Sequence, residues 1–226
     1  MAPASAEDGR PYRGGGRGHK RHGSPDCHNR RHGSHVVQCN MSAGTSTAGQ
    51  LDLALADYGR RWPDEAGTVA MFAALLCDRN EPFARTRLAG HFTASAWLVS
   101  QDRHRVLLTH HRKLDRWLQL GGHADGEQDL LRVALLEAEE ESGLTGLSVE
   151  PGIFDIDRHW IPEHKGVPAH WHYDVRYVLH AGGSEEYVVS DESHDLAWRV
   201  IAGLVDDNEA DPSLRRMAVK WIALLR

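Results

Sequence analysis

The apolar residues of this chain follow a helical period near both of its ends. They recur every three or four positions in residues 51–58, and a second apolar run covers 69–77 after a Trp-Pro break. At the other end, Asp211-Pro212-Ser213 has the composition of a helix start, and the apolar residues that follow keep the same spacing. The pattern predicts two packing helices early in the chain and one closing helix with an apolar face.

Between these helices the apolar pattern predicts strands instead. Extended segments are predicted at residues 92–99, 106–110, 117–120, 147–158, 171–179 and 196–201. A polar turn at 101–103 joins the first two into a hairpin. A further helix is predicted over residues 127–142, and strands on both sides of a helix are typical of a layered α/β domain with a mixed sheet.

One predicted strand alternates strictly between polar and apolar positions. In residues 168–176, period two places His170, His172, Asp174 and Arg176 on one face and large apolar residues on the other. The apolar face is expected in the core. The polar face is either an ordinary solvent-facing surface or the wall of a substrate cleft.

Three glutamates gather near the end of the helix predicted over residues 127–142. Glu137, Glu140 and Glu141 stand at i, i+3 and i+4, so their side chains share one face and can converge. Gly143 is placed to adopt the left-handed conformation that ends a helix. A helix C-terminus carries about half a negative charge, which destabilises each acid there by roughly 0.3–1 kcal/mol. Either a bound cation such as Mg²⁺ offsets this cost, or the acids form a solvated helix end.

The glycine pair upstream favours the metal interpretation. Gly121-Gly122 follows the short predicted strand at 117–120 and is expected to let the backbone turn sharply, close to the acidic helix. Strand, glycine turn and acid-bearing helix then form one constellation.

That constellation resembles the signature of the Nudix hydrolases. In the signature a glycine is followed after five residues by Glu, and after seven more by Arg-Glu-apolar-any-Glu-Glu, any residue, Gly and an apolar residue. Counted from Gly122, the chain matches the signature at Glu137, Ala138, Glu140, Glu141, Gly143 and Leu144.

The chain departs from the signature at two positions. Gln128 stands where the family has its first Glu, and Leu136 stands where it has Arg. In the family these side chains support the metal-binding glutamates. Two interpretations remain open: Glu127 and Arg132 form a shifted pair that still braces the helix, or the scaffold has weakened or abandoned catalysis.

The resemblance implies a fold, a domain organisation and an activity. The fold would be a Nudix-like α/β/α sandwich with a mixed sheet, preceded by a helical extension. Residues 1–40 would be a disordered tail, 41–89 the helical extension and 90–226 the Nudix domain. The activity would be Mg²⁺-dependent hydrolysis, with Mn²⁺ as a substitute metal, of a diphosphate linkage in a small nucleoside diphosphate-type substrate. The alternative is a catalytically inactive nucleotide-binding sensor or regulatory module.

The resemblance also implies roles for individual residues. The metal ligands would be Glu137, Glu140, Glu141 and the carbonyl of Gly121. The catalytic residues would be Glu140, which holds the attacking water, and Glu192, the general base on a later loop. The expected substrate contacts are His123, His170, His172 and Lys113.

Composition limits the remaining function classes. The chain has 226 residues with 41% hydrophobic content, which suits one main domain. It lacks an apolar span of about 18 residues, so a cytoplasmic protein without a membrane partner is expected. The formal net charge is −6, although residues 1–40 carry seven Lys/Arg and three Asp/Glu. This basic Gly/Arg/His-rich tail could attract nucleic acid, but nucleic-acid binding is not the expected function. Met41 offers an alternative start, and the oligomeric state stays open.

Overall fold

The computed structural model describes residues 47–112, 114–164, 166–190 and 193–226. The predicted basic tail at 1–40, Lys113 and Glu192 lie outside the described residues. Within the described part of the chain, no helix combines the length and apolar character needed to cross a lipid bilayer.

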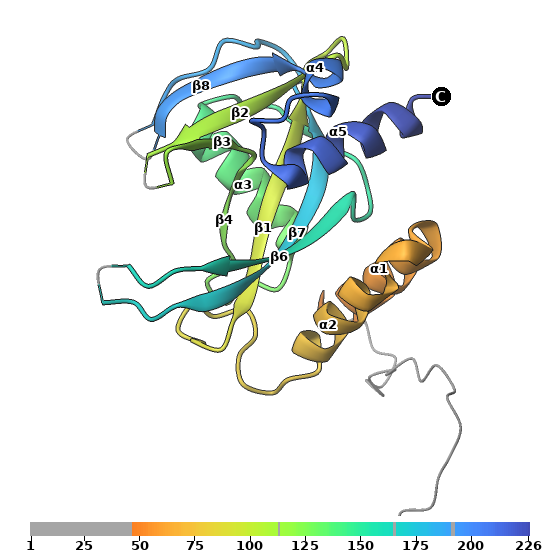
Figure 1. Ribbon diagram of the computed structural model, residues 1–226, viewed down its shortest axis with the longest axis vertical. Helices are drawn as coiled ribbons and strands as arrows, with labels where there is room; N and C mark the ends of the chain where they lie inside the picture. Colours follow the sequence, from red (N-terminus) through yellow and green to blue (C-terminus); the bar gives the residue numbers. More distant parts are fainter. Residues whose placement is uncertain (1–46, 113, 165, 191–192) are drawn as a thin grey trace, which may run out of the picture. The chain divides into compact units, whose positions relative to one another are not determined.

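An eight-stranded mixed sheet forms the centre of the described fold (Figure 1). Its path runs β3-β2-β1-β7-β5, while β4 pairs with β1, β6 with β7 and β8 with β2. The central pair β1–β7 is parallel and the other pairs among these strands are antiparallel. The strands are β1 (His91–Val99), β2 (Arg105–His111), β3 (Arg116–Leu118), β4 (Leu120–His123), β5 (Ser148–Val149), β6 (Asp155–Ile161), β7 (His170–His180) and β8 (Ser193–Val200).

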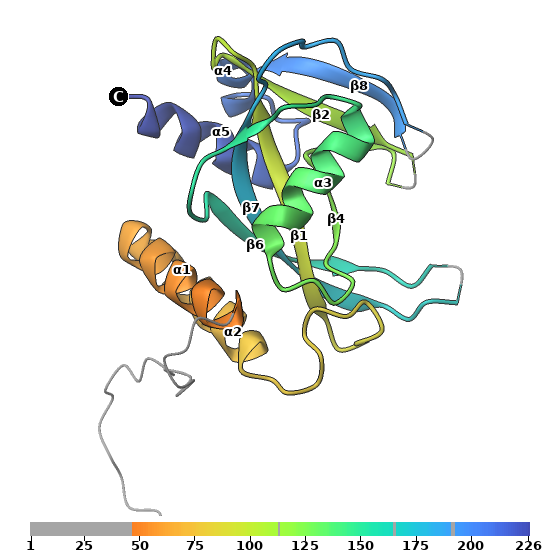
Figure 2. The ribbon, with the colours of Figure 1, turned by 180° about the vertical axis from the view of Figure 1, so that it is seen from behind.

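Helices cover both faces of this sheet. They are α1 (Thr47–Arg61), the 3₁₀ turn η1 (Pro63–Glu65), α2 (Ala66–Leu76), α3 (Leu130–Ser142), α4 (Ile201–Val205) and α5 (Pro212–Leu224). One face packs against α3, which lies in front of the sheet in Figure 2, and the opposite face packs against α4 and α5. The expected arrangement of a mixed sheet between helical layers is therefore confirmed.

Strand β1 packs against a separate hydrophobic core on each face of the sheet. All nine of its residues are buried. Phe92 and Ala94 belong to a core shared with α1, α2 and α3, whereas Trp97 and Val99 belong to a core shared with α4 and α5. Because neighbouring strand positions point to opposite faces, a strand covered on both sides is buried at every position. The predicted hairpin of residues 92–110 is also present, as β1 and β2.

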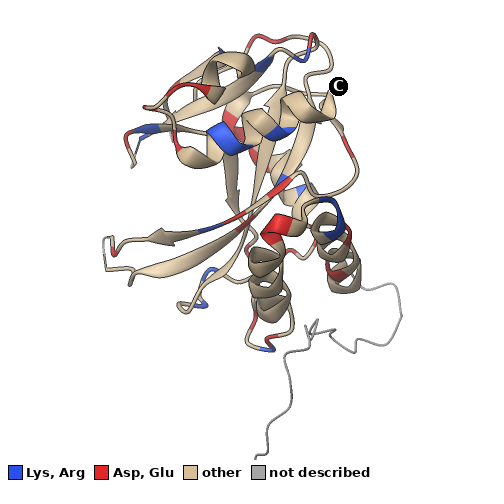
Figure 3. Ribbon diagram, turned by 45° about the vertical axis from the view of Figure 1, so that its right-hand side comes forward, with Lys and Arg blue, Asp and Glu red and all other residues tan. Residues whose placement is uncertain are grey.

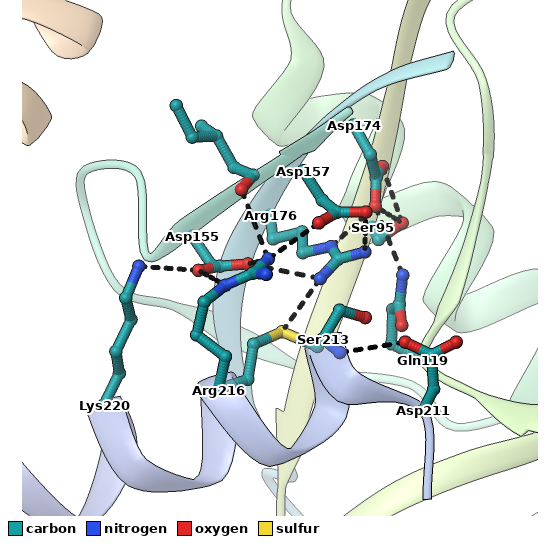
Figure 4. Close-up of polar contacts among 12 residues, drawn as sticks. Ser95, Gln119, Asp155, Asp157, Asp174, Arg176, Asp211, Ser213, Arg216 and Lys220 are labelled. Atoms are coloured by element: carbon teal, nitrogen blue, oxygen red, sulfur yellow. Dashed lines mark hydrogen bonds and ion pairs between the residues drawn. The ribbon is translucent and has the colours of Figure 1, made fainter. Parts of the chain in front are cut away.

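A buried network of charges joins α5 to strands β6 and β7 (Figure 4). Figure 3 marks the positions of the acidic and basic residues along the chain. Arg176 is 2% exposed and contacts Asp174 at 2.7 Å and Asp155 at 3.2 Å. From α5, Arg216 reaches Asp155 at 2.7 Å, and Lys220 reaches the same carboxylate at 2.6 Å. Burial alone would raise the pKa of Asp155, but the Arg216 hydrogen bond and the three nearby cations lower it.

This network corrects one interpretation of the alternating strand. His170, His172, Asp174 and Arg176 do share the polar face of β7, as predicted. At Asp174 and Arg176, however, that face is not an ordinary solvent-facing surface, because α5 covers it and both side chains are buried. Thr93 and Ser95 of β1 also donate hydrogen bonds to Asp174, at 3.0 and 2.8 Å.

Candidate active site

Helix α3 carries the three glutamates, and its two ends have local causes. Asp129 caps the start by accepting a hydrogen bond from the backbone N–H of Arg132 at 3.1 Å. The helix therefore begins at Leu130, three residues later than predicted. Gly143 ends it with a φ of 69°, and its N–H donates to the carbonyl of Glu139 at 2.8 Å. The predicted left-handed cap is confirmed.

The glycine pair does not form the predicted turn. Gly121 and Gly122 belong to strand β4 and pair with Ser95 and Ala94 of β1. The chain turns afterwards, where Asp125 (φ 50°) and Gly126 (φ 92°) adopt left-handed conformations. The glycines are instead needed for close approach, because the helix that follows packs tightly on β4.

Two of the three glutamates contact these glycines directly. The carboxylate of Glu137 lies where a Cβ at position 122 would be, so a side chain there would displace that acid from the strand. The backbone N–H of Gly121 donates to Oε1 of Glu141 at 3.0 Å. Glu137 and Glu141 are half-buried, whereas Glu140 is exposed. The structure thus brings two carboxylates to β4 and leaves the third beside them in solvent.

This donor set fits a magnesium ion. Mg²⁺ binds to proteins through one or two carboxylates and completes its shell with waters and substrate phosphates. Glu137 and Glu141 supply two such carboxylates at a helix C-terminus, where their negative charge is least favourable without a cation. The three glutamates are nevertheless not among the described residues whose potential ligand atoms all lie within 4.8 Å of one another.

The segment between β4 and α3 is held by contacts near its two ends. The N–H of Gly126 donates to the carbonyl of Phe83 at 3.0 Å, and Arg85 forms an ion pair with Asp125. Glu127 and Arg132 form the shifted ion pair considered from the sequence, at 3.2 Å. Both partners of that shifted pair are well exposed, so it braces the start of α3 only weakly.

The predicted substrate histidines also come together. Nε2 of His170 lies 3.1 Å from Nε2 of His172, and the His172 ring centroid is 5.0 Å from that of His123. Two further histidines join them: the ring centroids of His91 and His159 lie 4.9 and 5.4 Å from that of His172. Because His123 and Gly122 are successive strand residues, this histidine cluster lies on the sheet face opposite Glu137.

Burial keeps three of these imidazoles, His91, His123 and His172, neutral. Desolvation, with smaller contributions from neighbouring groups, lowers the pKa of His123 to about 4 and that of His172 to about 2. Burial also lowers the pKa of His91. At neutral pH these three residues therefore present nitrogen lone pairs and N–H donors rather than positive charges.

His91 and the partners of the buried network were missed by the sequence interpretation. The signal for His91 was available, because His91, Thr93 and Ser95 are polar positions that alternate with apolar ones, as on β7. No comparable local signal marks Asp155, Arg216 and Lys220, whose contacts join segments about 60 residues apart.

No protein-family model matches this chain, and no curated protein sequence matches it. Among solved structures, it is similar to a hydrolase of the NUDIX family from Clostridium perfringens, with 25% identity, 60% of this chain and 98% of that chain covered, and a TM-score of 0.48.

Two further solved structures have the same kind of similarity. The C. elegans Ap4A hydrolase binary complex has 16% identity, 59% and 96% coverage and a TM-score of 0.48. The NUDIX domain of Shewanella oneidensis NrtR, complexed with ADP ribose, has 17% identity, 60% and 88% coverage and a TM-score of 0.44. Two of these three structures are named as Nudix proteins.

Proposed function

We propose that this protein is a Nudix-type, Mg²⁺-dependent hydrolase that cleaves a diphosphate linkage in a small nucleoside diphosphate-type substrate in the cytoplasm. One observation carries the proposal: Glu137 and Glu141, from the last turns of α3, both pack against the backbone of the β4 glycines. Two half-buried carboxylates beside the half-buried backbone of Gly121 and Gly122 are a suitable binding place for a hard cation and the phosphate it would accompany.

The residues of the site have separate roles in metal binding, water orientation and proton transfer. Glu137 and Glu141 would hold the metal, with Mn²⁺ as a substitute for Mg²⁺ and the carbonyl of Gly121 as a neutral ligand. When bound, the metal would neutralise phosphate charge and lower the pKa of the attacking water. Glu140, exposed on the same helix, would orient that water. A carboxylate at Glu192 is proposed as the general base that accepts its proton.

A second candidate function is nucleotide binding without turnover. Gln128 and Leu136 motivate it, because both signature side chains that support the glutamates are absent and the shifted pair Glu127–Arg132 is solvent-exposed. Such a module would bind the same ligands and act as a sensor or regulator.

A phosphate-release screen separates the two functions. The full chain would be assayed with Mg²⁺ or Mn²⁺ against nucleoside diphosphate sugars, dinucleoside polyphosphates, ADP-ribose and nucleoside triphosphates. Turnover of one class supports the hydrolase. Tight binding of a ligand without turnover, with either metal and across pH, would establish the sensor instead.

A matched pair of variants on α3 tests whether the site is the one proposed. Glu141→Gln should lower activity roughly 100-fold or more, since even changes to the outer partners of a metal site cost about 10–100-fold. Glu139→Gln removes the same charge from the same helix two residues away, on a different face, and should leave activity close to that of the unsubstituted protein. Equal losses in the two variants would show that the effect is only one of helix charge.

A further inference from the structure

The histidine cluster forms a row across four neighbouring strands. His91 of β1 is the register partner of His172 on β7, and His172 is in turn the partner of His159 on β6. His123 of β4 is opposite Thr93, two residues along β1 from His91 and on the same face. Directly opposed residues of a sheet point to the same side, so the four imidazoles extend from one face.

Hydrogen bonds to carbonyl groups set the tautomers of two of these histidines. Nδ1 of His91 lies 3.2 Å from the carbonyl of Arg87, and Nδ1 of His170 lies 2.8 Å from the carbonyl of Pro168. A carbonyl can only accept, so each Nδ1 carries the proton and each Nε2 carries a lone pair. An imidazole that donates Nδ1–H to a backbone carbonyl and points Nε2 elsewhere has the arrangement of a metal-ligating histidine.

Nε2 of His91 is a buried hydrogen-bond acceptor that receives no hydrogen bond from the described residues. His91 is 1% exposed, and its Nε2 is buried without a hydrogen-bond partner among the described residues. A buried polar atom without a partner costs roughly 1–3 kcal/mol. His170 does not have this problem, because its Nε2 faces Nε2 of His172 at 3.1 Å.

Three of the histidines are spaced for a shared ligand. One nitrogen from each of His91, His123 and His172 can be chosen so that all three atoms lie within 4.8 Å of one another. Tetrahedral zinc with Zn–N bonds of about 2.0–2.1 Å requires N···N separations of about 3.4 Å. Side-chain movements of about 1 Å would therefore close the site, without any change in strand register.

We propose that His91, His123 and His172 form a binding site for a divalent metal of the zinc class, on the sheet face opposite the glutamates. Three neutral nitrogen ligands favour Zn²⁺ over Mg²⁺, which prefers oxygen. Three protein ligands also leave a fourth position for water or another small ligand. His170 positions His172 through their Nε2 contact, and the site does not rest on the proposed diphosphate hydrolysis.

Zinc titration of the purified full-length chain, followed by calorimetry and metal analysis after gel filtration, tests the site. We expect one equivalent to bind tightly, and His123→Gln and His172→Gln each to weaken its affinity roughly 100-fold or more. His104→Gln is the matched control, since His104 is exposed and lies outside the cluster; it should leave the affinity unchanged. If a double His123→Gln, His172→Gln variant still binds one equivalent of zinc, the proposal is overturned.

Two further variants separate this site from other zinc-binding places in the chain. Glu141→Gln should retain the equivalent if the glutamates are not its ligands, and loss of zinc there would overturn the assignment. A variant in which asparagine replaces the tail histidines should likewise retain the equivalent of zinc. If that variant loses the zinc, the tail is the binding place. The tail histidines are His19, His22, His28, His32 and His35.

The unsubstituted protein provides a readout that does not depend on variant folding. Imidazole ¹⁵N resonances distinguish protonated, unprotonated and metal-bound ring nitrogens. One equivalent of Zn²⁺ should shift the resonances of His91, His123 and His172 and leave that of His104 in place. Zinc that shifts none of the three would overturn the proposal, as would zinc that fails to bind at all.

Discussion

The carboxylate of Glu137 occupies the space that a side chain at Gly122 would need. The two residues lie on different elements, β4 and α3, and the contact places the acid directly over the strand backbone. Together with the hydrogen bond from Gly121 to Glu141, it fixes two acids against a backbone that has no side chains to shield them.

Substitution of Gly122 tests this contact. Gly122→Ala should displace Glu137, because the added Cβ overlaps its carboxylate, and should change the free energy of unfolding little, because that carboxylate is the end of a flexible side chain. Hydrolase activity should fall more steeply than stability. Urea unfolding and kcat/KM measure the two effects. Gly67→Ala is the control: a Cβ at Gly67 meets no atom within 4 Å, so stability should be unchanged or slightly higher.

Leu136 tests whether the missing signature arginine weakens the site. Leu136 is 42% exposed, so Leu136→Arg adds a cation in the middle of α3 without displacing the core. We expect about 0.2–0.5 kcal/mol of added stability from its i, i+4 pair with Glu140, and a several-fold rise in kcat/KM. Leu136→Gln removes the same apolar group without adding charge. If kcat/KM of Leu136→Arg is unchanged or lower, the missing arginine is not what weakens the support of the glutamates.

Arg176 is expected to matter far more for stability than a surface arginine. Its guanidinium is buried and contacts Asp155, Asp157 and Asp174, so Arg176→Leu removes a cation shared by three carboxylates. The expected loss is about 3–5 kcal/mol, measured by urea unfolding. Arg60→Leu is the matched control, because Arg60 is 71% exposed in its pair with Asp57 and should cost less than about 1 kcal/mol. Similar losses in both variants would contradict the structural role assigned to the network.

The histidine cluster predicts a loss of stability in mild acid. In the folded protein the pKa of His123 is about 4 and that of His172 about 2, below the ordinary value of 6.5. Below pH 6.5 the unfolded chain therefore binds more protons than the folded chain, so the free energy of unfolding declines as pH falls from 6.5 towards 4. Thermal unfolding in a chelator at pH 7.5 and 5.5 measures the decline.

The same pH effect has an internal control. His123→Gln removes one titrating group and should reduce the difference in Tm between pH 7.5 and 5.5. The buried carboxylates do not produce this difference, because the lowered pKa values of Asp155 and Asp157 place their loss of stability below pH 4. An unchanged difference in the variant would mean that His123 is not the source.

Features that depend only on neighbours along the chain could be predicted from the sequence. The glutamate spacing on α3 and its Gly143 cap follow from helix geometry, and the polar face of β7 follows from strand geometry. The Asp211-Pro212 start of α5 was readable for the same reason, because Asp211 accepts a hydrogen bond from the N–H of Ser213. Each of these depends on at most a few turns or residues of backbone.

Which of these features lie next to one another depends on long-range strand pairing. Local pattern could not show that Gly121-Gly122 would extend as a strand on β1, since the pairing partner lies about 28 residues earlier. Nor could it show that His91 would lie beside His172, because parallel pairing joins segments 81 residues apart. Register between distant strands, not composition, placed two carboxylates on one face of the sheet and a histidine row on the other.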